Sequence, residues 1–473
     1  MSQPLRSLPF GRTRTLHMVG IGGIGMSSIA QVLLARGYTV TGSDAKKSDV
    51  TDRLEQLGAT VYEGHDAAHV GDADVVVYSS AVKVNDNPET LEARRRRIPL
   101  IGRPVMLGEL MRLKQGVGIA GTHGKTTTTS MAGLMLSKAG FDPTIIVGGK
   151  VAAFGGSNAV AGEGDLIVIE ADEYDRTFLR LTPVYAVVTN IEADHLDIYR
   201  DLDDIKDAFA QYAASVPFFG AAILCLDDAN VQDLIPQLAD RRVITYGTTR
   251  QADLRADRIR REDDRTRFDV LWHGVSLGEA ALHAPGLHNV RNALAAIAVG
   301  LELEVPFATI AEALEAFTGV ERRFQVIGEA DGVLVVDDYA HHPTEIRATL
   351  DAATTAYRDR RIVAVFQPHL YSRTRDLLDD FAHAFGDADV LVMTDIYPAR
   401  EQPIPGVTGA GLAERTRTLG HRDVRFVEDK AALPAYLAEI CREGDLVVTM
   451  GAGDIHRYGK QFHQQRLAGG GTP

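Results

Sequence analysis

The sequence has little cysteine and no long apolar run, and each shortage argues against a class of protein. Only two of the 473 residues are cysteine, Cys225 and Cys441. Both lie in apolar surroundings without C-x-x-C spacing, so we expect two buried thiols in a reducing compartment rather than disulfides or a zinc site. No stretch reaches the roughly 18 apolar residues of a membrane span, and the N-terminal segment has no apolar signal-peptide core. The sequence therefore predicts a cytoplasmic protein without membrane insertion.

Basic residues are fewer than acidic ones, 50 Lys and Arg against 64 Asp and Glu. The formal net charge is −14 at pH 7, so a large basic surface for phosphate backbones is not expected, and neither is nucleic acid as the main partner. The one strong basic run, residues 94–97, ends a predicted helix (87–97), where cations complement the helix dipole. We interpret this run as a solvated helix end. Nothing in the sequence indicates an oligomeric state.

Apolar runs of strand length alternate with amphipathic helices through nearly the whole chain. This alternation predicts an α/β fold with mostly parallel sheets, and the length of the chain predicts more than one domain. We expect domains at 1–114, 115–319 and 320–473. Residues 251–277 are charged and irregular, and we expect a small antiparallel excursion there. The main predicted strands are residues 15–22, 38–44, 72–80, 98–102, 116–121, 165–172, 185–191, 221–228, 332–340, 361–369, 389–398 and 445–453.

A glycine-rich turn, MVGIGGIGMSS at residues 18–28, lies between the first predicted strand and helix. Gly20, Gly22 and Gly25 fit the pattern G-x-G-x-x-G, and Asp44 ends the next predicted strand. Glycines in such a turn let the backbone approach a pyrophosphate at a helix N-terminus. The pattern does not by itself distinguish a dinucleotide from another pyrophosphate ligand.

A second phosphate loop follows in GTHGKTTTT, residues 121–129. It departs from G-x-x-x-x-G-K-[ST], because Ile119 stands at the first glycine position. Lys125 can still reach phosphate oxygens, Thr126 can ligate Mg²⁺, and a helix N-terminus faces the anion. An NAD-dependent oxidoreductase would leave this loop unexplained. An ordinary P-loop switch or motor ATPase would leave the turn at Gly20 unexplained.

Carboxylate, amide and imidazole side chains follow two neighbouring predicted strands of the middle domain. Ligands collect at the C-terminal ends of strands in doubly wound sheets, so we expect these side chains near the second phosphate loop. There they could hold a magnesium ion against ATP oxygens. The side chains are Glu170, Asp172, Glu173, Asn190, Glu192, Asp194 and His195.

Six motifs in order make the chain resemble a known family. Together GTHGKTTTT, EADE, TNIEADHLD, HNVRNALAA, DDYAHHPTE and FQPHLYSRTRD are similar to the Mur ligases, ATP-dependent amide-forming enzymes, over essentially the whole chain. The resemblance implies a Rossmann-like N-terminal domain that binds a UDP-sugar, a central P-loop ATPase domain and a Rossmann-like C-terminal domain. It is strongest for members that join L-alanine to UDP-N-acetylmuramate, which implies these substrates with ATP and Mg²⁺ as cofactors.

Two related activities remain as alternatives. The ligase that attaches a recycled tripeptide to the same sugar shares most of the motifs, but the FQPH…SRTRD segment favours the L-alanine members. Folylpolyglutamate-type ligases share the ATPase core and have no N-terminal UDP-sugar domain.

The resemblance also implies roles for individual residues, position by position. The implied catalytic residues are Lys125, His195, His341 and Arg373, and the implied metal ligands are Thr126, Glu170 and His195. The implied ATP-binding residues are Gly121, Thr122, His123, Gly124, Lys125, Thr126, Thr127, Asn289, Asn292, Arg323 and Asp338. The implied UDP-sugar-binding residues are Gly20, Gly22, Gly23, Gly25, Asp44, Ser79 and Ser80. The implied amino-acid and acyl site consists of Tyr339, His369 and Arg373.

The chain departs from several relatives on the helix after the DH motif. Those relatives carry a lysine there, carbamylated in the folded enzyme, that bridges a second magnesium ion. Here the region reads Phe209–Ala210, and Lys206 is in a different register, so the ligation of a second ion is open. The third domain has no phosphate loop of its own. If its residues act on ATP, it must move onto the central domain, and we expect the hinge near 318–322.

Overall fold

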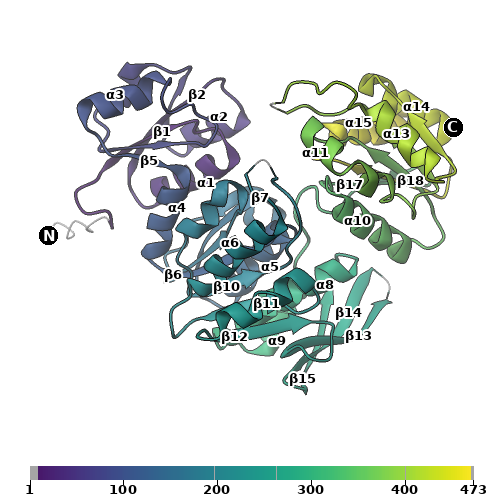
Figure 1. Ribbon diagram of the computed structural model, residues 1–473, viewed down its shortest axis with the longest axis horizontal. Coiled ribbons are helices and arrows are strands. Elements are labelled where there is room, and N and C mark those ends of the chain that lie inside the picture. The colour runs from purple at the N-terminus through teal and green to yellow at the C-terminus, as the bar shows by residue number, and fades with distance from the viewer. Residues whose placement is uncertain (1–8, 197, 263, 400, 470–473) are drawn as a thin grey trace. The chain divides into compact units, whose positions relative to one another are not determined.

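The computed structural model describes residues 9–196, 198–262, 264–399 and 401–469, which form three mostly parallel sheets with helices packed on them (Figure 1). The chain divides into two compact units. One comprises Met1–Asp257, Asp269–Ala280 and Arg291–Phe317, and the other comprises Arg258–Phe268, Ala281–Val290 and Thr318–Pro473. The predicted α/β class with mostly parallel sheets is confirmed.

The first sheet has five parallel strands in the order β3-β2-β1-β4-β5. The strand order reverses at β1, so the crevice for a ligand opens beyond the carboxyl ends of β1 and β4. The strands are β1 (Thr15–Val19), β2 (Thr39–Asp44), β3 (Thr60–Glu63), β4 (Val75–Tyr78) and β5 (Leu100–Gly102). The helices are α1 (Ile24–Ala35), α2 (Asp49–Gln56), η1 (Ala67–Val70), α3 (Pro88–Arg96) and α4 (Arg103–Arg112).

The second sheet has ten strands in the order β15-β14-β13-β12-β11-β10-β6-β9-β7-β8. Its middle strands β10 and β11 are buried along their whole length. The strands are β6 (Gln115–Ala120), β7 (Thr144–Val151), β8 (Ser157–Val160), β9 (Leu166–Glu170), β10 (Tyr185–Val188), β11 (Ala221–Cys225), β12 (Val243–Gly247), β13 (Leu254–Glu262), β14 (Arg265–Trp272) and β15 (Val275–Leu282). The helices are α5 (Lys125–Lys138), η2 (Ala152–Phe154), η3 (Tyr174–Arg180), α6 (Leu202–Ala214), α7 (Ala229–Gln232), η4 (Ile235–Leu238), α8 (Leu287–Glu302) and α9 (Phe307–Glu315).

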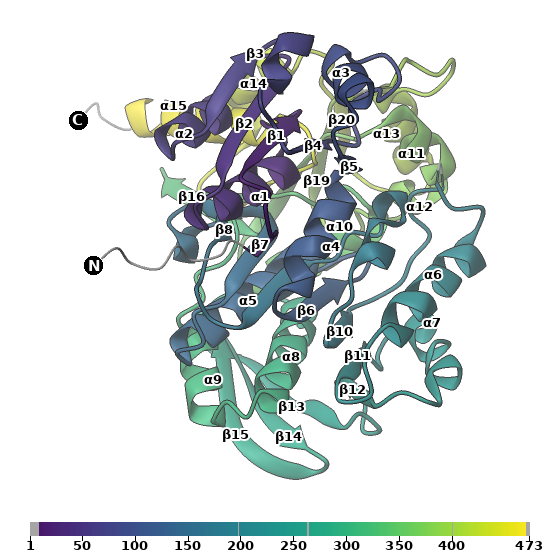
Figure 2. The same cartoon turned by 90° about the vertical axis from the view of Figure 1, so that its left-hand side faces the viewer.

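The irregular segment 251–277 is larger than the small excursion expected from the sequence. It contributes β13, β14 and the start of β15, which lie side by side and extend one end of the ten-stranded sheet (Figure 2). Residues along much of β14 alternate between buried and partly exposed. Because one face of these strands meets solvent, their sequence carries charge and lacks a continuous apolar run.

The third sheet has six strands in the order β16-β17-β21-β18-β19-β20. Its central strand β21 pairs in parallel with β17 and β18, and only β16 runs antiparallel to its neighbour. The strands are β16 (Gln325–Ala330), β17 (Val333–Asp338), β18 (Arg361–Phe366), β19 (Val390–Met393), β20 (Val424–Phe426) and β21 (Asp445–Met450). The helices are α10 (Pro343–Ala356), α11 (Tyr371–Asp376), α12 (Leu378–Ala382), α13 (Gly409–Thr418), η5 (Lys430–Ala432), α14 (Leu433–Ile440) and α15 (Ile455–Gly469).

Hydrogen bonds join helix α1 of the first sheet to the edge of the second sheet. The Gln31 side chain donates to Asn158 Oδ1 at 3.0 Å and accepts from Ser157 Oγ at 2.9 Å. Asn158 Nδ2 donates to the Ile24 carbonyl at 2.9 Å. These contacts hold the start of α1 against the central sheet.

The cysteines and the basic run lie where the sequence predicts them. Both cysteines are free and buried, as expected. The basic run at 94–96 lies exposed in the last turn of α3, also as expected. In the part of the chain that the structure describes, no helix combines the length and the apolar character needed to cross a membrane.

Candidate active site

The first glycine turn is held between the ends of β2 and β4. Val19, the last residue of β1, is in register with Ser43 on one side and Tyr78 on the other, so Gly20 emerges beside Asp44 and Ser79. Gly20 N–H donates to the Ser43 carbonyl at 2.8 Å, and Gly22 N–H donates to Asp44 Oδ2 at 2.9 Å. Gly20 has φ +79°, and a Cβ there would lie 3.0 Å from the Ser79 Cβ. Both the conformation and the space therefore require glycine.

An arginine that was not identified from the sequence lies over the start of α1. The N-cap is Gly23, which has no side chain to cap the helix. The Arg103 guanidinium occupies the space where a Cβ on Gly25 would lie, and its Nη2 is 3.7 Å from Asp172 Oδ2. The turn thus combines main-chain N–H groups at a helix N-terminus with a nearby cation, which is an arrangement suited to a diphosphate. The position of Arg103 at the end of a predicted strand, residues 98–102, was the available signal. Ser80 follows Ser79 at the exposed end of β4.

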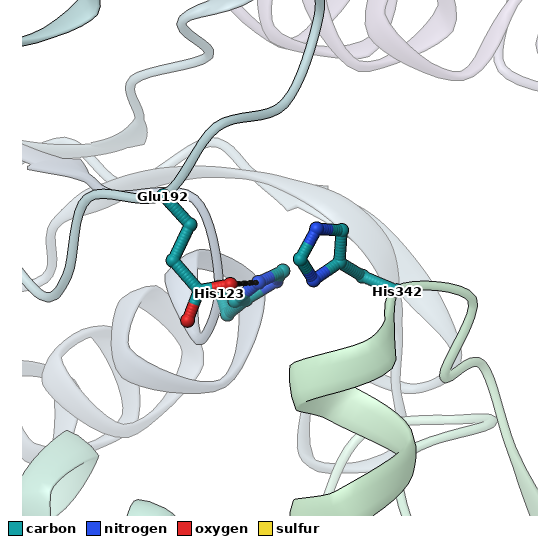
Figure 3. Close-up of side chains that lie close together, drawn as sticks. All are labelled: His123, Glu192 and His342. Carbon is teal, nitrogen blue, oxygen red and sulfur yellow. Dashed lines mark hydrogen bonds and ion pairs between the residues drawn. The ribbon is translucent and has the colours of Figure 1, made fainter. Parts of the chain in front are cut away.

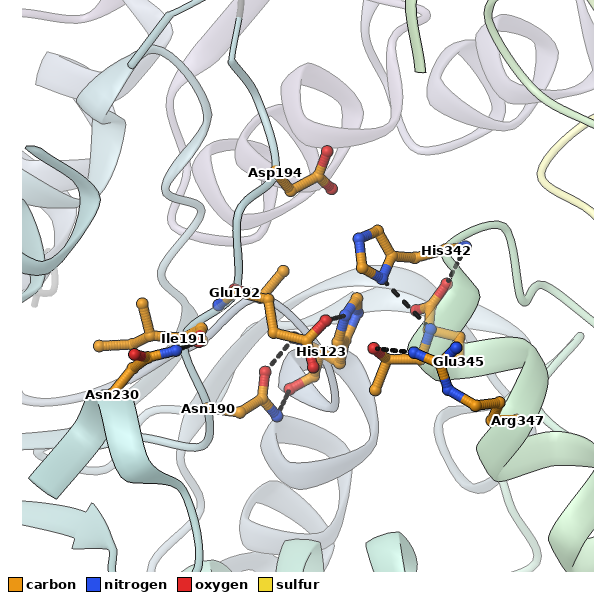
Figure 4. Close-up of polar contacts among 12 residues, drawn as sticks. His123, Asn190, Ile191, Glu192, Asp194, Asn230, His342, Glu345 and Arg347 are labelled. Atoms are coloured by element: carbon orange, nitrogen blue, oxygen red, sulfur yellow. Dashed lines mark hydrogen bonds and ion pairs between the residues drawn. The ribbon is translucent and has the colours of Figure 1, made fainter. Parts of the chain in front are cut away.

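The second phosphate loop joins the central strand β6 to α5. Ala120, the last residue of β6, is in register with Val188 of β10, and Ile119 with Glu170 of β9, so three strand ends meet here. The Thr122 N–H donates to the Asn190 carbonyl at 3.0 Å, and the His123 N–H donates to Asn190 Oδ1 at 2.8 Å (Figure 4). The loop is therefore fixed by the segment that follows β10.

Two glycines of this loop fit tightly under neighbouring side chains. Gly121 has φ +140° and Gly124 has φ +82°, conformations that favour glycine. A Cβ on Gly121 would meet the Thr189 hydroxyl, and one on Gly124 would meet the Asn292 side chain. Asn292 of α8 thus lies directly over the phosphate loop. Asn289, also on α8, is buried and donates to the Pro285 carbonyl at 2.7 Å.

Lys125 is held by a buried carboxylate in this structure. Its Nζ lies 2.7 Å from Glu173 Oε2 and 2.6 Å from the Gly121 carbonyl, and the Glu173 side chain is only 4% exposed. Burial raises the pKa of Glu173 to about 7 despite the neighbouring Lys125. Burial lowers the pKa of Lys125, but the charges of Glu173, Asp172 and Glu170 outweigh it and raise that pKa. The lysine is thus a partly buried cation beside the loop.

A hydroxyl and a carboxylate meet beside Lys125. Thr126 Oγ1, in the first turn of α5, donates to Glu170 Oε1 at 3.1 Å, and Glu170 Oε2 accepts from the Gly148 N–H at 2.7 Å. Oxygen ligands of this kind fit Mg²⁺, which binds proteins through one or two carboxylates and keeps several waters. His195, at φ +56° in the segment after β10, has Nε2 3.7 Å from Glu173 Oε1. The three implied metal ligands therefore lie around the same loop.

Glu192 contacts the loop through two groups. His123 and Glu192 point toward one another, with His123 Nε2 3.3 Å from Glu192 Oε2 (Figure 3). The Glu192 N–H donates to the Thr122 hydroxyl at 2.9 Å. The acidic segment after β10 is thus attached to the phosphate loop at both main-chain and side-chain atoms.

The helix that carries a metal-bridging lysine in several relatives has no lysine in that position here. Phe209 of α6 is fully buried and packs edge-on against Phe178, with ring centroids 5.0 Å apart. Lys206 Nζ pairs with Asp233 at 2.9 Å. Neither residue is directed to a metal site by these contacts.

In the other unit, residues at the end of β17 form a charged group. Asp338 accepts hydrogen bonds from the N–H groups of Phe324 and Ala340, each at 2.7 Å, and burial raises its pKa to about 6. The Arg323 guanidinium lies 5.2 Å from the centroid of the Tyr339 ring. Asp338 thus fixes the two chain segments that carry Arg323 and Tyr339.

Histidine and arginine side chains gather next to this group. Asp338 and Phe366 are both in register with Met450, so the segments after β17 and β18 emerge at one edge of the sheet. The rings of His341 and His369 have centroids 6.0 Å apart, and Arg373 Nη1 is 3.5 Å from His369 Nδ1. The implied residues of the C-terminal domain are therefore brought together.

Helix α10 begins beside this cluster. The His342 side chain accepts from the Thr344 N–H at 3.4 Å, and the Glu345 carboxylate accepts from the N–H groups of His341 and His342 (Figure 4). This reciprocal cap fixes the backbone of His341.

Family models match most of the chain. The description "Mur ligase family, catalytic domain" covers residues 15–115, "Mur ligase middle domain" covers 119–300, and "Mur ligase, glutamate ligase domain" covers 322–453.

Several relatives match over nearly their full length. A UDP-N-acetylmuramate–L-alanine ligase from Salinibacter ruber is 64% identical over 469 residues, which are 99% of this chain and 98% of that protein. A protein of the same name from Syntrophotalea carbinolica is 55% identical over 97% of this chain and 100% of its own length. Among solved structures, the UDP-N-acetylmuramate-alanine ligase of Thermotoga maritima has a TM-score of 0.81 at 30% identity, covering 96% of this chain and 99% of that one. A murein peptide ligase from Psychrobacter arcticus has a TM-score of 0.68 at 27% identity, with the same coverage.

Proposed function

Since the chain belongs to the Mur ligase family, we propose that it joins L-alanine to the lactyl carboxylate of UDP-N-acetylmuramate, with conversion of ATP to ADP and phosphate. The observation that carries this assignment is the 64% identity, over 99% of the chain, to a protein named for this activity. Solved ligases of the murein peptide type, which represent the alternative, are more distant, at 27% identity over 96% of this chain and 33% identity over 66% of it.

The two phosphate loops account for the two nucleotides of this reaction. The turn at Gly20 offers main-chain N–H groups and Arg103 to the diphosphate of the UDP-sugar. The loop at Gly124, with Lys125 at the start of α5, receives the phosphates of ATP. Asn292 lies over this second loop, and we assign it with Asn289 to the nucleotide.

The chemistry requires activation, because a carboxylate has no adequate leaving group for direct attack by an amine. A carboxylate oxygen attacks the γ-phosphorus, the bond to the bridging oxygen breaks, and ADP leaves an acyl phosphate behind. The amine of alanine then attacks the acyl carbon, and phosphate departs from the tetrahedral intermediate. Lys125 and the N–H groups at the start of α5 stabilise the negative charge that develops in the first step.

Thr126, Glu170 and His195 would hold the magnesium ion, which would neutralise charge on the β- and γ-phosphates. Lys125 must exchange its contact with Glu173 for one with phosphate, or share its three protons between them.

The cluster in the second unit supplies the remaining groups. Arg323 and Arg373 are cations for the acyl phosphate, and His341 or His369 receives the proton that the ammonium of alanine must lose before attack. Tyr339 lines the same site. ATP and UDP-sugars are cytoplasmic metabolites, and we propose that the enzyme acts there.

Release of phosphate from ATP tests the proposal. Phosphate should appear only when both UDP-N-acetylmuramate and L-alanine are present, and mass spectrometry should find the alanyl amide of the sugar nucleotide. Phosphate release with neither substrate would indicate an autonomous ATPase. Product formation with the tripeptide and none with alanine would indicate the recycling ligase.

A further inference from the structure

A carboxylate that belongs to neither phosphate loop is fully buried between helix α3 and the N-terminal sheet. Glu89, in the first turn of α3, has a side chain that is 0% exposed, as has its neighbour His17. Four donors surround the two carboxylate oxygens. Oε1 faces His17 Nε2 at 3.3 Å and His69 Nδ1 at 3.2 Å, and Oε2 faces Ser43 Oγ at 2.7 Å and His65 Nδ1 at 2.9 Å.

The groups around Glu89 come from two strands of the sheet, the segment after β3 and η1. His17 is on β1, Ser43 on β2, His65 in the segment after β3, and His69 on η1. Because an ionised carboxylate only accepts, His17 Nε2 carries the proton that faces Glu89, and the other ring nitrogen, Nδ1, can accept from Thr41 Oγ1 at 2.8 Å. Burial raises the pKa of Glu89, but the hydrogen bonds from His17 and Ser43 outweigh it and the net shift is downward. The buried group is therefore an ionised carboxylate with its acceptor sites filled.

The same strand end that contacts Glu89 holds the glycine turn. The Ser43 hydroxyl donates to Glu89, whereas the Ser43 carbonyl accepts from the N–H groups of Gly20 and Ile21 at 2.8 and 3.0 Å. The next residue, Asp44, accepts from the Gly22 N–H. Three successive N–H groups of the turn are thus bonded to a two-residue segment of β2, whose first side chain is fixed by Glu89.

We propose that Glu89 is a positioning residue for the UDP-sugar site, acting through Ser43 on the glycine turn at Gly20. This inference rests on the proposed function for the identity of the ligand. In this role Glu89 does not touch the UDP-sugar itself. It sets the position of the end of β2 and therefore the directions of the N–H groups that remain available to the diphosphate.

A substitution to glutamine tests this directly. The glutamine amide would have the shape of the carboxylate, but its NH₂ group would place two donors against the donors that now surround Glu89. We therefore expect Glu89→Gln to disturb the end of β2 without removing any ligand-contacting atom. Glu92→Gln is the matched control, because Glu92 lies one turn further along α3 and pairs with the exposed Arg95.

The first measurement is binding of UDP-N-acetylmuramate by calorimetry without ATP. Glu89→Gln should weaken this affinity about tenfold, which corresponds to about 1.4 kcal/mol, and leave the KM for ATP within twofold, whereas Glu92→Gln should change neither. A folded Glu89→Gln protein that binds the sugar nucleotide within twofold of the parent affinity would overturn the inference.

Amide hydrogen exchange gives a readout that does not depend on the ligand. Exchange in residues 18–25 should accelerate in Glu89→Gln more than in the strands of the central sheet, since the effect is local rather than global. If Glu89→Gln does not fold, the variant Ser43→Ala tests the proposal instead, because it removes only the hydroxyl that donates to Glu89. Ser43→Ala should reduce the affinity for UDP-N-acetylmuramate severalfold. An unchanged affinity of this variant would contradict the proposal. The parent protein could also fail to bind UDP-N-acetylmuramate although Glu89→Gln accelerates exchange in residues 18–25. That result would contradict the proposed function.

Discussion

At the scale of single residues, the central phosphate loop depends on one partly buried cation. Lys125 contacts Glu173, the Gly121 carbonyl and the Thr122 carbonyl, all in segments that directly follow strands of the central sheet. The turn at Gly20, by contrast, is built from β2 and β4 of another sheet. Replacement of Lys125 should therefore affect the reaction of ATP and leave the binding of the UDP-sugar unchanged.

We expect Lys125→Ala to lower the rate of ligation by about 10³-fold or more, because it removes a charge that stabilises phosphoryl transfer. Binding of UDP-N-acetylmuramate should change by less than twofold in calorimetry. Lys138→Ala, at the exposed far end of the same helix, is the control and should retain activity. A loss of sugar-nucleotide affinity as large as the loss of rate would contradict the assignment.

The two thiols should be unreactive in the folded protein. Burial raises the pKa of Cys225 to about 11 and that of Cys441 to about 12, so the thiolate is scarce at pH 8. A chromogenic disulfide reagent should therefore detect no thiol in the native protein and two after denaturation. Rapid labelling of either cysteine in the native protein at pH 8 would show that it is accessible.

At the scale of the elements, helix α6 packs on the central strand β6 with a polar atom in the contact. In the part of the chain that the structure describes, the buried Tyr212 hydroxyl has no hydrogen-bond partner. It lies where a Cβ on Gly118 of β6 would be. Both residues therefore belong to one tightly packed contact between helix and sheet.

This contact predicts that substitutions of Tyr212 and of Gly118 change the free energy of unfolding differently. Tyr212→Phe removes an unsatisfied hydroxyl and should leave the free energy of unfolding unchanged or raise it by about 1 kcal/mol. Gly118→Ala should lower it by about 2 kcal/mol through overpacking. In the double variant the cost of Gly118→Ala should be smaller, because the hydroxyl that it meets is gone. Equal costs in the two backgrounds, measured by urea unfolding, would show that the residues do not compete for space.

The sequence was most informative where structure is local. Strands β9, β10 and β11 were predicted because buried parallel strands are continuous apolar runs. The phosphate loops were also found, because their glycines and lysine are close in sequence. Strands β3 and β16 were missed, since they are short or half-exposed at a sheet edge and carry no such run.

Long-range contacts account for what the sequence did not reveal in the site. Arg103 and Gly25 are brought together by the fold of the N-terminal sheet, and Glu89 meets His17 across 72 positions of chain. No spacing rule relates such pairs. The pairing of Lys125 with Glu173 likewise depends on how the ends of β6 and β9 align.

At the scale of the whole molecule, one of the points where the chain passes from the first unit to the second is Phe317–Thr318, at the start of the range 318–322 in which we predict a hinge. The second unit resumes at Thr318, and Gly319 follows with φ +97° and no atom within 4 Å of the place where a Cβ would be. The residues proposed to act on the acyl phosphate lie beyond this point, and the phosphate loop lies before it. Closure about the hinge would exclude water from a hydrolysable intermediate.

We therefore expect nucleotide and UDP-N-acetylmuramate together to reduce the radius of gyration measured by X-ray scattering. Gly319→Ala should lower kcat severalfold while the affinity for UDP-N-acetylmuramate stays within twofold, and the more rigid Gly319→Pro should have a larger effect. Gly140→Ala is a matched control, because Gly140 also has a positive φ, +85°, and open space, but follows α5. An unchanged radius with both ligands would contradict closure, whereas full activity of Gly319→Pro would place the hinge elsewhere.

The position of β21 in its sheet has a consequence for how the protein is made. This strand, Asp445–Met450, lies between β17 and β18, although it follows both of them in the sequence and is the last strand of the described residues. Until residues 445–450 have been synthesised, β17 and β18 lack the strand that joins them. The nascent C-terminal sheet is then two separate halves with unpaired inner edges, which is a state prone to aggregation. Completion of this domain must therefore wait until residues 445–450 have left the ribosome, and premature termination before residue 445 would leave a product that chaperones and proteases have to remove.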